Sequence, residues 1–225
     1  MQIVSDLALL LGSTEYSERE LFVDLLTQSH GVISVHARRT KKSPLLLQPF
    51  HRLRVELAPH KTSGFRLRAA TIDVPRMGAT LDAMMLAGQF LRWIRASIGP
   101  EPHPEVFALA DETIARAHRS SFDETSMAQA GFALLALLGV PLSFDACAAC
   151  GRPRPPSRPA WWNPLRGGVV CQDCHDPATD RTIAESKRLN LALNLVRGAS
   201  PDDAEYEASV LVHWVEQALA AVKYR

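Results

Sequence analysis

The segment His36–Arg68, with the sequence HARRTKKSPLLLQPFHRLRVELAPHKTSGFRLR, decides the fold of the first part of the chain. Within it, Leu53–Leu57 and Phe65–Asp73 alternate apolar with charged or small residues, as half-buried strands with one wet face do. The segment also holds nine basic residues against one acid, Glu56. The nine are Arg38, Arg39, Lys41, Lys42, Arg52, Arg54, Lys61, Arg66 and Arg68. A basic sheet surface indicates a polyanion partner, most simply nucleic acid, but the charge count fits a solvated face equally well.

Three more strands precede this alternation, at Asp6–Leu11, Glu20–Thr27 and, after Gly31, Val32–Ala37. Five strands in about seventy residues leave no room for crossover helices, so the pattern predicts a small antiparallel barrel. The five-stranded OB-fold, a common binder of single-stranded nucleic acid, fits this size, and an SH3-like barrel is the alternative. Arg38–Pro44 is polar, basic and closed by proline, which predicts a loop of the kind that carries ligand contacts.

From Ala79 onward the apolar residues recur at helical spacing. Five helices are predicted. The first begins near Thr80 or Asp82 and ends before Gly99, and the second covers residues 104–118. The third begins at the capping box Ser126-x-x-Gln129 and ends at Gly139, the fourth runs from Thr182 to about Arg197, and the fifth begins at Ser200-Pro201. The third is apolar on nearly every side, so we expect it at the centre of the helical part. The sequence therefore predicts an α+β chain, with an OB-fold barrel over residues 1–78 and an all-helical domain over 79–225.

A cysteine cluster interrupts the helices and predicts an inserted zinc module over about residues 140–182. Cys147-Ala-Ala-Cys150 and Cys171-Gln-Asp-Cys174 are separated by twenty residues, the spacing of a four-cysteine zinc site. Four protein ligands make such a site structural rather than catalytic, and His175 is expected to be a bystander. The proline-rich segment between the pairs has little core of its own, so its order depends on the metal. Two disulfides or a redox pair are the weaker alternatives, since neither a secretion signal nor a thioredoxin-like pattern is present.

Basic and aromatic residues surround the cysteines. They are Arg152, Arg154, Arg158, Arg166, Trp161 and Trp162. Arginine beside aromatic rings can hold nucleic acid bases by stacking. The favoured interpretation is that the tryptophans pack the module against the helices, because large aromatics are usually mostly buried.

The overall composition gives no indication of an enzyme or a membrane protein. The net charge is +1, but residues 1–79 carry eleven basic and seven acidic side chains (+4), and residues 80–225 carry fourteen and seventeen (−3). We find no phosphate-binding loop, dinucleotide fingerprint or nucleophile elbow. The acid pairs Asp123-Glu124 and Asp202-Asp203 lie at predicted helix starts, where the helix dipole accounts for them. Without a targeting signal or an apolar run of about 20 residues, we expect a soluble, intracellular protein.

Several short motifs occur together in the order typical of one family. They are Tyr16-Ser-Glu-Arg-Glu-Leu-Phe-Val-Asp-Leu-Leu-Thr27, Gly31-Val-Ile-Ser34, Ala37-Arg-Arg39, Lys42-Ser43 and Gln48-Pro-Phe50. In order and spacing they resemble the bacterial DNA repair protein RecO family of recombination mediators. The resemblance extends more loosely through the helices and the four-cysteine module. It departs at His36, where the family usually has a small residue, often glycine, before the Ala-Arg pair.

This resemblance implies a non-enzymatic protein that binds single- and double-stranded DNA and anneals complementary strands. It also implies a role with RecR in loading RecA onto strands coated by single-strand binding protein, whose acidic C-terminal tail is a further partner. The expected location is the cytoplasm, in association with the nucleoid. If four or five of the nine basic residues contact phosphate, log K should fall against log salt with a slope of roughly −3 for single strands.

Two other classes of function remain open. One is a general zinc-containing OB-fold protein that binds nucleic acid, for example RNA, without mediator activity. The other is an enzyme, or a structural subunit of one, in which zinc holds an interaction module. Strand annealing separates the first class from a mediator. Nuclease or helicase activity that disappears when one named residue is mutated would support the second.

Overall fold

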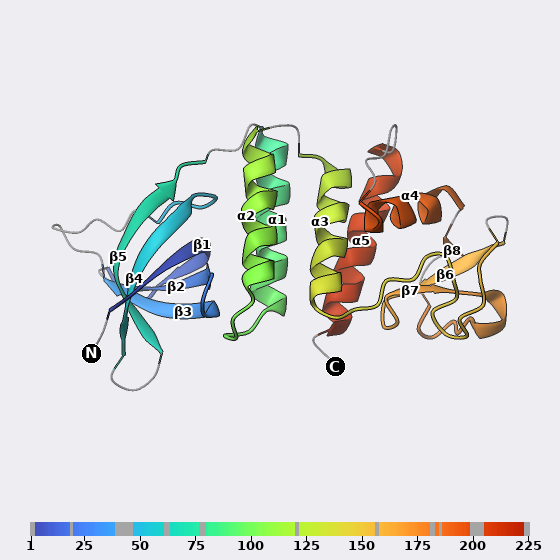
Figure 1. The fold of residues 1–225 in the computed structure, drawn as a ribbon, viewed down its shortest axis with the longest axis horizontal. Helices are drawn as coiled ribbons and strands as arrows, with labels where there is room; N and C mark the ends of the chain where they lie inside the picture. Colours follow the sequence, from blue (N-terminus) through green and yellow to red (C-terminus); the bar gives the residue numbers. More distant parts are fainter. Residues whose placement is uncertain are drawn as a thin grey trace. The chain divides into compact units, whose positions relative to one another are not determined.

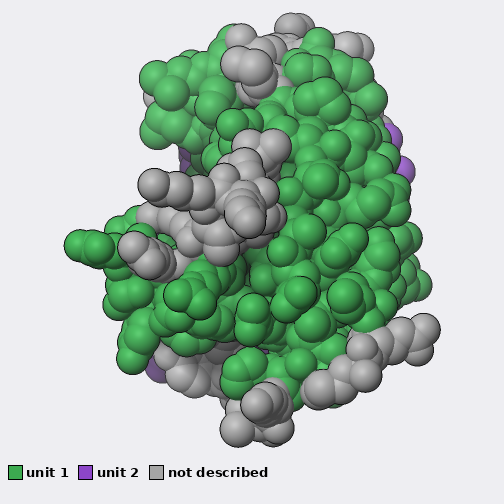
Figure 2. All heavy atoms as spheres, turned by 90° about the vertical axis from the view of Figure 1, so that its left-hand side faces the viewer, with its two compact units in different colours: residues 1–121 green, residues 122–225 purple. Residues whose placement is uncertain are grey.

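The computed structural model describes residues 3–18, 20–38, 47–60, 64–76, 80–119, 122–155, 158–180, 183–184, 186–198 and 205–222. The chain divides into two compact units, residues 1–121 and 122–225 (Figures 1 and 2). The first contains the strands of the barrel and two helices, and the second contains three helices and the cysteine module. A domain boundary after residue 78, at the end of the barrel, stays a prediction.

The first unit begins with a closed five-stranded barrel. Its strands are β1 (Val4–Glu15), β2 (Glu20–Thr27), β3 (Gly31–Arg38), β4 (Arg52–Pro59) and β5 (Phe65–Val74). They close in the order β1-β2-β3-β5-β4. All neighbours are antiparallel except β3 and β5, which run parallel. This arrangement confirms the OB-fold prediction over the SH3-like alternative.

The barrel core follows from the two-residue alternation of its strands. Val23, Leu25, Val35, Val55 and Leu57 are fully buried, and the residues between them face outward. Because a slip of one residue would exchange the two faces, the alternation specifies the register of the strands.

Helices α1 (Leu81–Ser97) and α2 (Pro104–Arg119) belong to the same unit as the barrel. The Thr80 hydroxyl caps α1 by accepting a hydrogen bond from the Ala83 N–H at 3.1 Å, as predicted. The segment between the helices meets the start of β3, where the Val32 N–H donates to the Gly99 carbonyl at 3.0 Å. Gly31 has a φ of 67°, and a Cβ there would lie 2.0 Å from the carbonyl oxygen of Glu101, so the contact requires glycine.

The second unit packs three helices with a small sheet. The helices are α3 (Glu124–Leu137), α4 (Ser186–Val196) and α5 (Glu205–Val222), and the sheet has the order β7 (Gly168–Val170), β6 (Ala160–Asn163) and β8 (Ile183–Ala184). Trp162 of β6 stacks on Trp214 of α5 with ring centroids 5.0 Å apart, and Phe144 stacks on both rings. These buried rings attach the sheet to the helices. No residue from 127 to 135 of α3 is exposed, in agreement with the expected central position of this helix.

Two local predictions in this unit were wrong. Helix α3 begins at Glu124, because the Asp123 carboxylate accepts the Ser126 N–H at 2.8 Å, and Ser126 is therefore not the cap. Ile183 and Ala184 pair with β6 as a strand, so α4 begins at Ser186 instead of near residue 182. The predicted caps at Thr182, Glu185, Ser200 and Pro201 lie outside the described residues. Among the helices that the structure describes, none has the length and apolar content needed to cross a membrane.

Candidate functional site

The four cysteines come together into one cluster. The sulfur atoms of Cys147, Cys150, Cys171 and Cys174 all lie within 4.8 Å of one another, and the Cys150 and Cys171 sulfurs are 4.0 Å apart. A tetrahedral ion with metal–sulfur bonds of about 2.3 Å requires sulfur–sulfur edges of about 3.8 Å. The donor set and its size therefore fit one tetrahedrally bound metal ion. All four thiols are free of disulfides, so the disulfide alternative does not describe this arrangement.

Each cysteine pair is held by its own tight turn. In the first turn the Gly151 N–H donates to the Cys147 carbonyl at 2.8 Å, and Gly151 adopts a φ of 71° that favours glycine. In the second turn the Cys174 N–H donates to the Cys171 carbonyl at 3.0 Å within a 3₁₀ turn, Gln172–Cys174. The sheet carries both turns, since the Ala148 N–H donates to the Val169 carbonyl at 2.7 Å.

The electrostatics of the cluster favour a cation. Burial raises the pKa of Cys147, but N–H groups of Cys171, Cys150 and Ala149 outweigh it and lower that pKa to about 6. Hydrogen bonds with the Cys171 and Cys150 thiols raise the pKa of Cys174 to about 12. One thiol thus ionises readily while another resists a further negative charge beside it. A divalent cation would relieve this repulsion and permit four thiolates.

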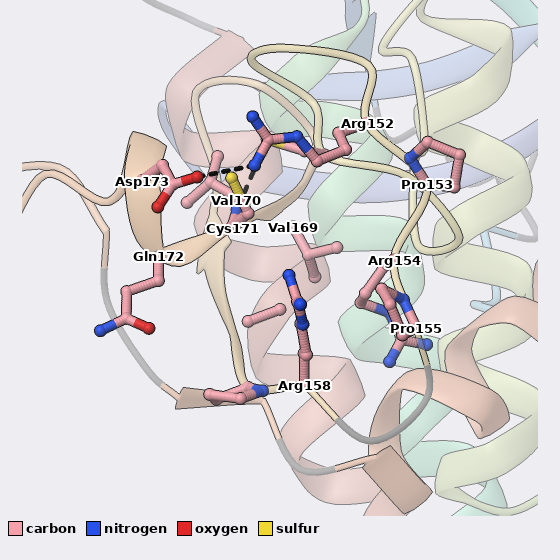
Figure 3. A pocket seen from close by; sticks show the side chains of 13 residues that line it. Arg152, Pro153, Arg154, Pro155, Arg158, Val169, Val170, Cys171, Gln172 and Asp173 are labelled. Carbon is pink, nitrogen blue, oxygen red and sulfur yellow. Dashed lines mark hydrogen bonds and ion pairs between the residues drawn. The ribbon is translucent and has the colours of Figure 1, made fainter.

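An ion pair joins the two turns at the surface. The Arg152 guanidinium donates to the Asp173 carboxylate at 2.6 Å and lies beside Cys171 (Figure 3). The hydrogen bond to Asp173, with the charges of Cys150 and Cys171, raises the pKa of Arg152. A pocket of about 200 Å³ adjoins this pair, and the Arg158 side chain extends into it. Arg154 donates to the Phe144 carbonyl at 3.0 Å, so this arginine supports the loop that carries the first turn.

His175 and the tryptophans have structural partners. The His175 ring stacks on Trp161 at 4.4 Å and its Nδ1 lies 3.0 Å from the Asp180 carboxylate. Burial raises the pKa of Asp180, but hydrogen bonds from the Asp176 N–H and Asn163 outweigh it and lower the pKa. These contacts give His175 a structural role, and its position as a bystander to the metal stays a prediction. Trp162 is fully buried, which leaves it no face for a nucleic acid base.

The predicted basic residues fall into three groups. Arg38 on β3 and Arg66 and Arg68 on β5 are exposed on the outside of two neighbouring strands of the barrel. Arg52 and Arg54 on β4 are held by carboxylates instead. The remaining four, Arg39, Lys41, Lys42 and Lys61, lie outside the described residues.

The β4 arginines belong to an ion-pair network that joins the barrel to α2. Asp73 accepts from Arg52 and Arg54, both at 2.8 Å, and Asp111 accepts from Arg52 at 3.1 Å and Arg76 at 2.7 Å. Hydrogen bonds from Arg52 and Arg54 lower the pKa of Asp73, and the hydrogen bond to Asp73 raises the pKa of Arg52. The network gives Arg52 and Arg54 a structural role, and their contact with DNA stays a prediction.

Aromatic side chains occupy the same outer surface as the exposed arginines Arg38, Arg66 and Arg68. Tyr16 and Phe22 have ring centroids 5.9 Å apart, and Phe22 and His36 have centroids 5.7 Å apart. The sequence-based prediction missed this row. The signal that points to it is the alternation of β2, which places Phe22 outward between the buried Leu21 and Val23.

Two family models match the chain, and together they cover both units. The model for the N-terminal part of recombination protein O matches residues 1–72, and the model for its C-terminal part matches residues 80–217.

Similar proteins from several bacteria carry the name DNA repair protein RecO. The one from Myxococcus xanthus is 32% identical over 187 residues, which cover 77% of this chain and 73% of the relative. The proteins of Methylobacterium nodulans (26% identity; 80% of this chain, 74% of the relative) and Desulforudis audaxviator (28%; 75% and 69%) are also similar. With its barrel, its cysteine cluster and these matches, the chain belongs to the RecO family of DNA repair proteins.

Proposed function

We propose that this chain binds single- and double-stranded DNA through the outer surface of β3 and β5 and acts as a recombination mediator. The observation that carries the proposal is the set of exposed guanidinium groups of Arg38, Arg66 and Arg68 on neighbouring strands of an OB-fold barrel. Within the described part of the chain, these three arginines form no ion pair with a carboxylate. Such cations neutralise phosphates without reading sequence, as a protein that handles any damaged site requires.

The mediator activity has three components: annealing of complementary strands, action with RecR, and help in loading RecA onto strands coated by single-strand binding protein. Family membership supports them, as does the resemblance of the N-terminal motifs. Contact with the acidic tail of the single-strand binding protein and association with the nucleoid belong to the same proposal. Annealing requires no bond to be made or broken in the strands, so the proposed activity is not enzymatic.

The proposed metal is one structural zinc ion held by the four cysteines. Four thiolates on a tetrahedron are the donor set of structural zinc sites. The ion would cross-link the two cysteine turns beside the small β7-β6-β8 sheet, and it would leave no coordination position for catalysis. One zinc per chain in the purified protein, measured by mass spectrometry of the metal, is the expected result.

The test is annealing of two complementary DNA strands, each coated with single-strand binding protein, at low and moderate salt and without ATP. The wild-type chain should accelerate annealing. Arg66→Glu/Arg68→Glu should lose at least about 25-fold in single-strand affinity at about 0.1 M salt, because each phosphate contact contributes about 0.7 log units there. The salt slope should fall by about 1.4 for the same reason. Arg119→Glu/Arg197→Glu is the matched control, since both arginines are exposed and lie elsewhere.

The outcomes separate the alternatives. Binding of naked strands without annealing of coated ones would support a general nucleic-acid-binding protein, and a preference for RNA would support an RNA binder. If wild-type protein neither binds nor anneals, the exposed arginines form only a solvated surface. Equal losses in the barrel variant and the control would remove β5 from the site.

A further inference from the structure

A row of three aromatic rings runs across the outside of the barrel. Phe22 on β2 pairs directly with His36 on β3, and Tyr16 lies at the start of the β1–β2 connection beside Phe22. Neighbouring rings meet edge to face, with interplanar angles of 80° and 64°. The row is thus built from contacting side chains of β2, β3 and the connection between β1 and β2.

Two of the three rings are widely open to solvent, and the third, His36, is 27% exposed with its Nε2 3.7 Å from the Glu20 carboxylate. Tyr16 is 72% exposed and Phe22 is 43% exposed. Single exposed apolar residues are ordinary on proteins. A contiguous row of exposed rings is less common on protein surfaces. This row continues into a depression of about 260 Å³ lined by Phe22, Ser34, His36, His60 and Phe65.

Cations border the row on the β5 side. Arg66 pairs with His36 across the parallel β3–β5 ladder, so both side chains emerge on the same face, and Arg38 follows two residues after His36 on that face. Aromatic rings beside a strip of positive charge are the two components of a surface for unpaired nucleic acid, since bases stack on rings while phosphates meet cations. An aromatic pair that served only to stabilise the sheet would not require these cations.

We infer that Tyr16, Phe22 and His36 form a base-stacking platform for single-stranded DNA. The inference rests on the proposed function and adds to it a preference for single-stranded over duplex DNA. The bases of an intact duplex are paired within the helix and present no face to the rings, so stacking favours unpaired strands. Arg38 and Arg66 contact phosphates and do not distinguish the two forms. The platform thereby holds exposed bases of one strand where its complement can reach them.

The test compares Phe22→Ala and Phe22→Leu with the wild-type chain on single-stranded and duplex DNA of equal length. Loss of stacking on one base should weaken single-strand binding about tenfold, within a range of about 5-fold to about 150-fold. Duplex affinity should stay within about twofold, because phosphate contacts are retained. The salt slope should be unchanged, because a ring releases no counterions, whereas Arg66→Glu should change it on both substrates. Leu137→Ala, at a residue of similar exposure in the second unit, is the control for removal of an exposed apolar side chain.

Phe22→Leu separates stacking from apolar contact, since leucine keeps most of the apolar area and lacks a π-face. Crosslinking with a single strand carrying 5-iododeoxyuridine should label the peptides of Tyr16, Phe22 or His36. Equal losses on single-stranded and duplex DNA, or unaltered binding by Phe22→Ala and Phe22→Leu, would overturn the platform and leave DNA binding by the arginines intact. If Phe22→Leu binds like wild type while Phe22→Ala does not, the surface is an apolar contact without stacking, which also overturns it. A wild-type chain that binds no DNA would instead refute the proposed function.

Discussion

Asp111 of α2 joins that helix to the barrel through ion pairs with two arginines. Its carboxylate accepts from Arg76 at 2.7 Å and from Arg52 at 3.1 Å, and the Arg76 side chain is only 7% exposed. Substitution Asp111→Ala would leave a guanidinium buried without its partner. Glu112, the residue after Asp111, forms an ion pair with Arg119 at 2.9 Å, and both side chains are more than 60% exposed. The two acids therefore provide a buried and an exposed test of the same kind of interaction.

The expected losses of unfolding free energy differ several-fold between Asp111→Ala and Glu112→Ala. Removing one partner of a buried ion pair costs about 3–5 kcal/mol, and we expect about 3 kcal/mol for Asp111→Ala because Arg52 is partly exposed and can rehydrate. Glu112→Ala should cost under about 1 kcal/mol. For a unit of this size, 3 kcal/mol lowers the unfolding temperature by about 10 °C. Arg76→Met/Asp111→Leu should recover most of the loss, since no unpaired charge remains.

Urea unfolding of the full chain measures the free energies, and hydrogen exchange of the peptides of α2 and β4 localises the effect to the first unit. Equal costs for Asp111→Ala and Glu112→Ala would refute the reasoning, because burial would then have no influence on the pair. Loss of protection in the second unit alone would refute it as well.

Three further predictions concern the metal, the pH and the backbone. Cys147→Ser/Cys150→Ser should lose the metal and lower the unfolding temperature of the second unit; unchanged metal content and melting would contradict the site. Asp73, whose pKa is lowered first by the Arg52 hydrogen bond, contributes stability above its ordinary pKa of 3.8 that is lost as pH falls through the lowered pKa. Urea unfolding between about pH 3 and about pH 7 should thus show a steeper acid loss for wild type than for Asp73→Asn. Gly31→Ala should lower the free energy of unfolding by about 3 kcal/mol or more, because its Cβ would overlap the Glu101 carbonyl. Gly64→Ala, with open space at its Cβ, should lower it by about 1 kcal/mol. Urea unfolding measures both losses, and equal losses would contradict the clash.

Features that depend on neighbours along the chain could be predicted from the sequence. Strands such as Glu20–Thr27 and Phe65–Val74 alternate inward and outward residues, and this period alone identifies them. The cysteine pairs are equally local, because two residues between thiols fix the turn that brings them to one ion. Helix α3 shows where local signals compete: Asp123 and Ser126 both suit a cap, and only the folded backbone selects Asp123.

The availability of each arginine was decided by the tertiary structure. Arg52 and Arg66 occupy the same kind of outward strand position, yet Arg52 meets Asp111 from a helix 59 residues away and Arg66 lies beside His36. The row of Tyr16, Phe22 and His36 likewise exists only when β2 and β3 pair in register. The sequence by itself determined the strands of the barrel, the bodies of the helices and the metal-binding turns, because those depend on backbone periodicity and short spacing. It did not identify the short strands β6, β7 and β8, which pair only in the folded second unit. Only the tertiary structure decided which charges are neutralised and which rings meet, because Coulomb and stacking interactions act through distances in space between residues far apart in the chain.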